Sequence, residues 1–122
     1  MYVFSFEKLE VWKEAIELSK DIYKITVTFP SDEKFGLTSQ IRRATNSIAA
    51  NIAEGTSRIT GKDKAYFTTI AFSTTMEVLN HLIISKELEF ISVEQYLELR
   101  ERINKISNML NALRKSQLRK NV

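Results

Sequence analysis

The sequence predicts an all-α fold, an antiparallel up-down four-helix bundle that forms a single domain over residues 1–122. Its 122 residues are 43% hydrophobic, which suits one compact core. The single proline and three glycines leave four stretches, each long enough for a helix of about 30–40 Å at 1.5 Å per residue. Apolar residues recur at helical spacing in all four stretches. Four similar helices with short connections are typical of an antiparallel bundle.

The first helix is expected over about residues 6–29, because its apolar residues share one helix face. These residues are Leu9, Trp12, Ala15, Ile16, Ile22 and Ile25. Pro30 cannot continue the helix, and Ser31 is placed to act as the N-cap of the next one.

The second helix is expected over about residues 32–54, with Gly55 as a left-handed C-cap. Its predicted core face consists of Leu37, Ile41, Ala44, Ile48 and Ile52. A polar stripe runs beside this face and consists of Gln40, Arg43, Ser47, Asn51 and Glu54. Exposed helix faces are normally richer in Lys and Glu, so we predict that the stripe contacts another helix or subunit. Both a structural hydrogen-bond network and a binding site remain open.

The third helix, about residues 61–88, carries two apolar stripes on nearly opposite sides. The first consists of Phe67, Ile70, Ala71, Thr74, Val78 and Leu82. The second consists of Phe72, Met76, Leu79 and Ile83. No helix of a four-helix bundle is central, so the second stripe would face water unless another subunit covers it. We therefore predict a homo-oligomer, the alternative being that the inter-helix loops or the Met1–Phe6 arm covers this stripe within one chain.

The fourth helix is expected over about residues 92–116, followed by a basic tail at 117–122. Ser92 and Gln95 match a capping box at its start. The core face then follows the 3.5-residue period of a left-handed bundle. Its residues are Tyr96, Leu99, Ile103, Ile106, Leu110 and Leu113.

One histidine and no cysteine leave the chain with little catalytic chemistry. These counts exclude thiol nucleophiles, cysteine zinc sites and paired-histidine metal sites. Glu77 precedes His81 by one helical turn, but the pair occurs once, and we expect a solvent-facing or hydrogen-bonded histidine. We predict a protein that is not an enzyme, with no catalytic residue, cofactor or metal. The distant alternative is a carboxylate pair formed by Glu54 and Glu77.

No stretch approaches the ~18 apolar residues of a membrane span. The N-terminus has neither a basic region nor a long apolar run, so we expect no secretory signal. The lack of cysteine fits a reducing compartment. We therefore expect a cytoplasmic protein with no membrane partner.

Positive charge is concentrated at the C-terminal end of the chain. Residues 1–99 contain 11 basic and 14 acidic side chains, whereas residues 100–122 contain seven and one. Further cations surround the second helix and the loop after it. The candidate nucleic-acid-binding residues are Arg42, Arg43, Arg58, Lys62, Lys64, Arg114, Lys115, Arg119 and Lys120. Such a surface can hold a phosphate backbone without reading sequence, the alternative being a solvated surface that keeps the protein soluble.

Several runs resemble a known family. They are Phe6–Trp12, Phe29–Pro30, Glu33–Leu37, Gln40–Ala44 and Ser47–Gly55. They are similar to the four-helix-bundle proteins encoded in intervening sequences of bacterial 23S rRNA genes, and the likeness covers about residues 4–115. Ala49 and Ser73-Thr74 depart from the usual Pro and Gly-Ser.

The resemblance implies an antiparallel four-helix bundle, commonly assembled as a ring of five, with no established enzymatic activity. A related branch serves as the accessory protein of diversity-generating retroelements, where a basic pentameric barrel associates with nucleic acid and a reverse transcriptase. We therefore expect a homopentamer that binds RNA or DNA backbone. The alternative is a scaffold that binds another protein and has no nucleic-acid role.

Overall fold

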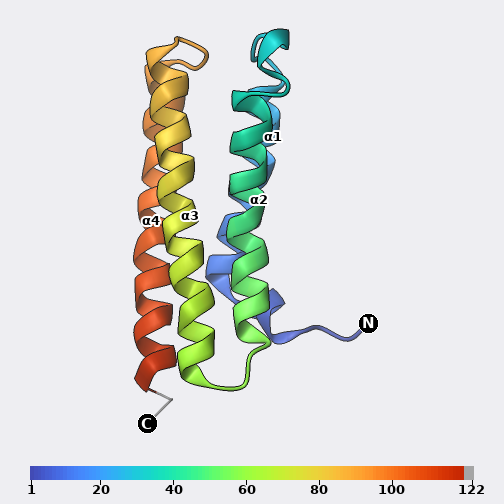
Figure 1. Cartoon of the computed structure of the whole chain (residues 1–122), viewed down its shortest axis with the longest axis vertical. Coiled ribbons are helices and arrows are strands. Elements are labelled where there is room, and N and C mark those ends of the chain that lie inside the picture. The colour runs from blue at the N-terminus through green and yellow to red at the C-terminus, as the bar shows by residue number, and fades with distance from the viewer. Residues whose placement is uncertain (120–122) are drawn as a thin grey trace.

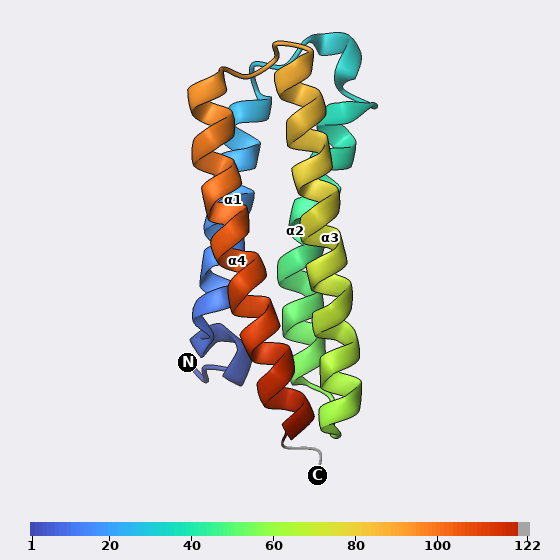
Figure 2. The same ribbon diagram turned by 90° about the vertical axis from the view of Figure 1, so that its left-hand side faces the viewer.

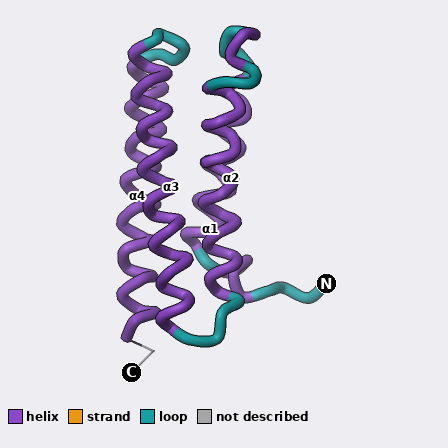
Figure 3. The backbone as a smooth tube through the Cα atoms, viewed as in Figure 1, coloured by secondary structure: helices purple, strands orange, loops and turns teal. Residues whose placement is uncertain are grey.

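The computed structural model describes residues 1–119 and contains only helices and connections over that range (Figure 3). The α-helices are α1 (Glu10–Thr26), α2 (Leu37–Thr56), α3 (Gly61–Glu87) and α4 (Val93–Arg119). Two short 3₁₀ helices, η1 (Ser5–Lys8) and η2 (Ser31–Glu33), precede α1 and α2. The predicted all-α class with four helices is confirmed.

The four helices lie side by side along the long axis of the molecule (Figures 1 and 2). The α1–α2 and α3–α4 connections lie at one end, which we call the apical end. The α2–α3 connection, η1 and the end of α4 lie at the other, which we call the basal end. The two ends of the bundle therefore carry different segments of the chain.

The core faces of α2 and α4 are those that the periodicity predicts. All five predicted residues of α2 are buried, and Ile41 and Ile48 are completely inaccessible. In α4 the predicted face is buried from Tyr96 to Leu110, and Leu113 is half-buried against the core. The capping box is also confirmed, because Gln95 N–H donates to Ser92 Oγ at 3.0 Å and Ser92 N–H donates to Gln95 Oε1 at 2.8 Å.

The core face of α1 is rotated relative to the prediction. The buried residues are Val11, Ala15, Leu18 and Ile22. Of these, only Ala15 and Ile22 belong to the predicted core face. Leu9, Trp12, Ile16 and Ile25 are half-buried at the edge of the core. The expected helix over 6–29 is also too long. Leu9 has extended backbone angles that separate η1 from α1, and the helix ends at Thr26.

Two predicted caps are wrong. Ser31 begins η2 and makes no capping hydrogen bond, and α2 starts at Leu37, where Glu33 Oε1 accepts the backbone N–H at 3.1 Å. A carboxylate at this position also interacts favourably with the helix dipole. Gly55 does not end α2 in a left-handed conformation, because it lies inside the helix and none of the three glycines has a positive φ.

Gly55 instead permits close contact between α2 and α3. A Cβ atom at this position would lie 3.0 Å from Cβ of Phe67 and 3.3 Å from the backbone oxygen of Lys64. Both neighbouring atoms belong to α3, and one of them is backbone. The absence of a side chain at Gly55 therefore sets the separation of the two helices near the basal end.

The core face of α3 is built largely from small and hydroxyl-bearing residues. Its buried positions include Thr68, Ala71, Thr75, Val78, Leu82 and Ser85. The buried hydroxyls bond to the carbonyl one turn earlier, as in Thr75 to Ala71 at 2.8 Å and Ser85 to His81 at 2.8 Å. This satisfies the polar group within the helix and leaves the methyl of threonine free to pack.

The first apolar stripe of α3 supplies Ala71, Val78 and Leu82 to this core face, and the second stripe lies at the edge of the same core. Phe72, Leu79 and Ile83 are half-buried against the core, and only Met76 of the second stripe is exposed, at 38%. The apolar surface that led to the prediction of an oligomer is therefore smaller than the sequence indicated, and most of it is covered within one chain.

The α1–α4 seam is joined by charged side chains. Arg102 of α4 pairs with Asp21 and lies 3.9 Å from Glu14, and Lys105 lies 3.1 Å from Glu14. Arg100 donates to the hydroxyl of Tyr96 at 2.6 Å. Three of the C-terminal cations thus have partners inside the bundle.

Over the described range no helix combines the length and apolar character that crossing a membrane requires.

Candidate nucleic-acid interface

The predicted basic residues divide into two groups. Arg42 and Arg43 lie in the second turn of α2, near the apical end. The others lie at the basal end, and they are Arg58, Lys62, Lys64, Arg114, Lys115 and Arg119. Arg43 and the end of α2 are ~20 Å apart at 1.5 Å per residue, so the structure does not bring the two groups together. Lys120, the remaining candidate, lies outside the described residues.

Three of the candidate arginines form hydrogen bonds or cation–π contacts with a neighbouring helix. Arg42 donates from Nε to Thr26 Oγ1 at 2.8 Å, and its guanidinium lies 4.6 Å from the centre of the Tyr23 ring. Arg58 lies 4.5 Å from the Phe67 ring, and Arg114 donates from Nε to Thr69 Oγ1 at 2.9 Å. These contacts are of the cation–π and hydrogen-bonding kind that hold an arginine in place.

The remaining basal candidates are Lys62, Lys64, Lys115 and Arg119, which we call the basal cations. None of them forms an ion pair with another residue in the part of the chain that the structure describes. All but Lys64, which is half-buried, have exposed side chains. Charges without protein partners remain available to phosphate groups.

The connections at the apical end have the opposite charge balance. Together with the helix turns beside them they carry Asp32, Glu33, Glu87, Glu89 and Glu94, against Lys24, Lys34 and Lys86, while Arg42 and Arg43 lie one turn further along α2. The chain's overall charge of +3 conceals this polarity. A polyanion is therefore attracted more strongly to the basal end than to the apical connections.

The polar stripe of α2 lies along the α2–α3 seam of the same chain. Gln40, Arg43 and Ser47 line a groove of about 380 Å³, opposite Thr74 and Glu77 of α3. Further along the stripe, Asn51 Nδ2 donates to the backbone oxygen and Oγ of Ser47, at 2.9 and 3.0 Å, and Glu54 lies 3.5 Å from Arg58. The stripe thus combines hydrogen bonds within α2 with one side of a groove.

The two carboxylates considered as a catalytic pair are separated along the bundle. Glu77 faces the groove at the level of Arg43, and Glu54 lies 11 residues further along α2, ~16 Å away at 1.5 Å per residue. Glu77 Oε2 instead lies 3.2 Å from His81 Nε2. His81 is buried and not solvent-facing, and its Nδ1 has no hydrogen-bond partner among residues 1–119.

The matching family model is that of the 23S rRNA-intervening sequence proteins, and it covers residues 7–112. The chain belongs to this family. A solved structure from Bacteroides thetaiotaomicron, described as a protein of unknown function from the S23 ribosomal protein family, is 27% identical to this chain. The two superpose with a TM-score of 0.77 over 86% of this chain and 98% of the other. No curated protein matches the sequence.

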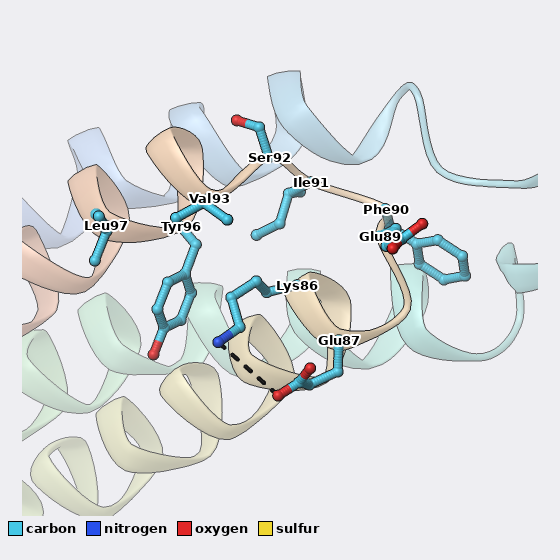
Figure 4. A pocket seen from close by; sticks show the side chains of 9 residues that line it. All are labelled: Lys86, Glu87, Glu89, Phe90, Ile91, Ser92, Val93, Tyr96 and Leu97. Carbon is cyan, nitrogen blue, oxygen red and sulfur yellow. Dashed lines mark ion pairs between the residues drawn. The ribbon is translucent and has the colours of Figure 1, made fainter.

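This 23S rRNA-intervening sequence protein also has an apical hollow that the sequence analysis did not identify. The hollow has a volume of about 740 Å³, and Figure 4 shows Lys86, Tyr96 and Leu97 among its lining residues. The ammonium of Lys86 lies 4.8 Å from the Tyr96 ring and 3.9 Å from Glu87. Leu88, Val93 and Leu97 are each more than half exposed at this end. The spacing of Val93 and Leu97, four residues apart and off the core face of α4, is the signal that could have indicated it.

Proposed function

We propose that this 23S rRNA-intervening sequence protein is a non-catalytic, oligomeric protein of the cytoplasm that binds the backbone of RNA or DNA at its basal end. The observation that carries the proposal is the group of basal cations, which have no ion-pair partner among residues 1–119, at one end of a bundle whose other end has acidic connections. Contacts of this kind neutralise phosphates and release counterions without reading bases. The contacts therefore supply affinity and leave sequence preference low.

The proposal includes an antiparallel up-down bundle that assembles as a homo-oligomeric ring of five copies. The position of the connections in Figure 1 supports the up-down order. The exposed Met76 and the exposed Tyr2 and Phe4 of the N-terminal arm supply apolar surface for contacts between copies. In a ring of parallel copies every basal end faces the same side. The cations of all copies then act on one strand, which multiplies a weak individual affinity.

The first test measures the salt dependence of binding to a fluorescently labelled single-stranded RNA. For the parent, the logarithm of the association constant should fall linearly with the logarithm of salt concentration. The triple variant Lys62→Ala/Lys115→Ala/Arg119→Ala should flatten this slope by about 0.7 for each lost phosphate contact. The matched control is Lys34→Ala/Lys86→Ala, which removes cations from the acidic apical end and should leave the slope unchanged.

An unchanged slope in the triple variant would show that the basal cations are not the contact. Native purification, with mass and absorbance ratio measured before and after nuclease treatment, reports both the number of copies and any bound nucleic acid. A single copy without nucleic acid at every concentration would contradict the proposal.

A protein-binding scaffold is the second candidate function, and the apical hollow favours it. Exposed Leu88, Val93 and Leu97 beside this hollow form an apolar surface, which is typical of protein contacts. Capture of a protein partner that is insensitive to salt, with no nucleic acid in the complex, would support this function. Loss of that capture in Val93→Lys/Leu97→Lys, with no change in RNA binding, would locate it at the apical end.

A further inference from the structure

A second cavity, of about 420 Å³, lies at the basal end where η1, α2, α3 and α4 meet. Its volume falls within the ~300–1,000 Å³ of typical small-molecule sites. The polar side chains that supply donors to it are Ser5, Lys64, Ser116 and Gln117. The half-buried Leu9 and Leu113 form apolar walls, the exposed Ile59 adds apolar surface, and no acidic residue lines the cavity. The cavity therefore offers donors and apolar surface together, with no competing carboxylate.

Gln117 is the most informative of these residues because its side chain is buried and only partly bonded. The residue is 7% exposed, and its Oε1 accepts a hydrogen bond from Thr68 Oγ1 at 2.7 Å. That bond fixes the amide, and the structure shows no acceptor for Nε2 in the described part of the chain. Nε2 is nevertheless not among the atoms sealed from solvent. Gln117 lines the cavity, so its amide is the polar group that a buried side chain presents there.

The other three donors are also free. Within residues 1–119, the hydroxyls of Ser5 and Ser116 and the ammonium of Lys64 make no hydrogen bond or ion pair to a side chain. They come from η1, α4 and α3, so three separate elements direct donors toward one space. A group with several acceptor oxygens and negative charge, as a phosphate has, can accept from all three of them at once.

We propose that this cavity binds a single nucleotide unit. Lys64 and the hydroxyls of Ser5 and Ser116 hold the phosphate, and the base lies between the apolar walls with its edge at the amide of Gln117. The inference rests on the proposed function and adds a specific site to it, because an unstacked nucleotide of a bound strand would enter here. Amide contacts to base edges and insertion of splayed bases are common in recognition of single strands. A purely apolar ligand would displace water from the Gln117 amide without replacing its hydrogen bond, at a cost in free energy.

The test uses adenosine 5′-monophosphate as the probe and the ¹⁵N-labelled full-length protein, observed by NMR at low salt. We expect the nucleotide to shift the backbone amides of Lys64, Ser116 and Gln117 in a saturable way. Lys64→Met should weaken binding about tenfold, the effect of losing one charge-assisted contact. The matched control is Lys8→Met, which removes an exposed lysine of η1 that does not line the cavity and should leave the affinity unchanged.

A second variant, Ser116→Leu, fills the cavity without changing charge and should abolish the shifts. Its thermal unfolding and spectrum show whether the fold is kept, and Lys64→Met remains as the independent test. Inorganic phosphate and adenosine, titrated separately, should each bind more weakly than the nucleotide. Binding of phosphate alone with equal affinity would overturn the base contact.

Failure of this inference can be distinguished from failure of the proposed function. If the nucleotide shifts none of the cavity amides and Lys64→Met binds it as the parent does, the cavity site is wrong. The dependence of RNA affinity on salt concentration is measured separately, and it tests the exposed Lys62, Lys115 and Arg119 of the proposed function. A competition experiment between the nucleotide and a single-stranded oligonucleotide then shows whether a bound strand also enters the cavity. If the two do not compete, a strand does not insert a nucleotide there.

Discussion

Because Gly55 has no side chain, α2 and α3 can approach each other closely at this residue. A substitution of Gly55 tests this effect directly. Gly55→Ala should lower the free energy of unfolding by about 1–3 kcal/mol, because the new methyl meets Cβ of Phe67 and the Lys64 carbonyl oxygen. At an open helical position the same change would stabilise by about 1 kcal/mol. Urea denaturation measures the difference.

Gly36→Ala is the comparison for this prediction, since the new methyl there meets only Glu33 Oε1, at 2.9 Å, which accepts the Leu37 N–H. Loss of such a helix cap costs about 1 kcal/mol. Its effect should be smaller than that of Gly55→Ala. A Gly55→Ala variant as stable as the parent would mean that α3 can move away from α2 at little cost.

Between elements, the α1–α4 seam provides a comparison of two cations with different exposure. Arg102 contacts Asp21 and Glu14 with a side chain that is 25% exposed, whereas Lys105 contacts Glu14 from a side chain that is 61% exposed. We expect Arg102→Ala to lower the free energy of unfolding by about 1–2 kcal/mol, because it leaves two partly buried carboxylates without a shared partner. Lys105→Ala should change it by less than about 1 kcal/mol, as for other exposed pairs.

Chemical denaturation at low and high salt would measure both effects. Equal losses in the two variants would show that the seam depends on packing of the aliphatic parts and not on charge.

The number and order of the helices and the core faces of α2 and α4 could be predicted from the sequence, because large apolar residues recur there at helical spacing. The faces of α1 and α3 were harder for a physical reason. Thr68, Thr75 and Ser85 count as polar in any hydropathy pattern, yet all three are buried with their hydroxyls hydrogen-bonded. Thr75 and Ser85 donate within α3, and Thr68 donates to Gln117 of α4. The half-buried Phe72 and Leu79 then look like a separate stripe when they are the edge of the same core.

The candidate site was predicted in part. Residue type alone identified the cations, but the internal contacts of Arg42, Arg58 and Arg114 depend on helix pairing that no local pattern encodes. The basal cavity was not predicted either, because its lining residues are far apart in sequence and individually ordinary.

At the scale of the whole molecule, a substitution of one exposed side chain of α3 tests whether copies of the protein associate. Met76→Lys places a charge on the exposed member of the second stripe and should reduce the mass measured by light scattering toward that of a single copy. The fold should be kept, because Met76 is 38% exposed. Ile84→Lys is the matched control on the same helix, 39% exposed and turned by about 80° around the axis.

Retention of the parent mass in Met76→Lys would exclude this part of α3 from the contact between copies. Loss of mass in Ile84→Lys alone would place the contact near the apical hollow.

Figures 1 and 2 show the N-terminal arm and the end of α4 both at the basal end of the bundle. An affinity tag fused to either terminus would then crowd the very surface at which RNA is expected. A circular permutant that joins the two basal ends and opens at the α3–α4 turn would move such tags to the other end of the bundle. Its linker must span the basal end, because Figure 1 shows the N-terminal arm on the opposite side from α4. Binding assays on tagged material and on the permutant need not agree, and the second is the fairer measurement.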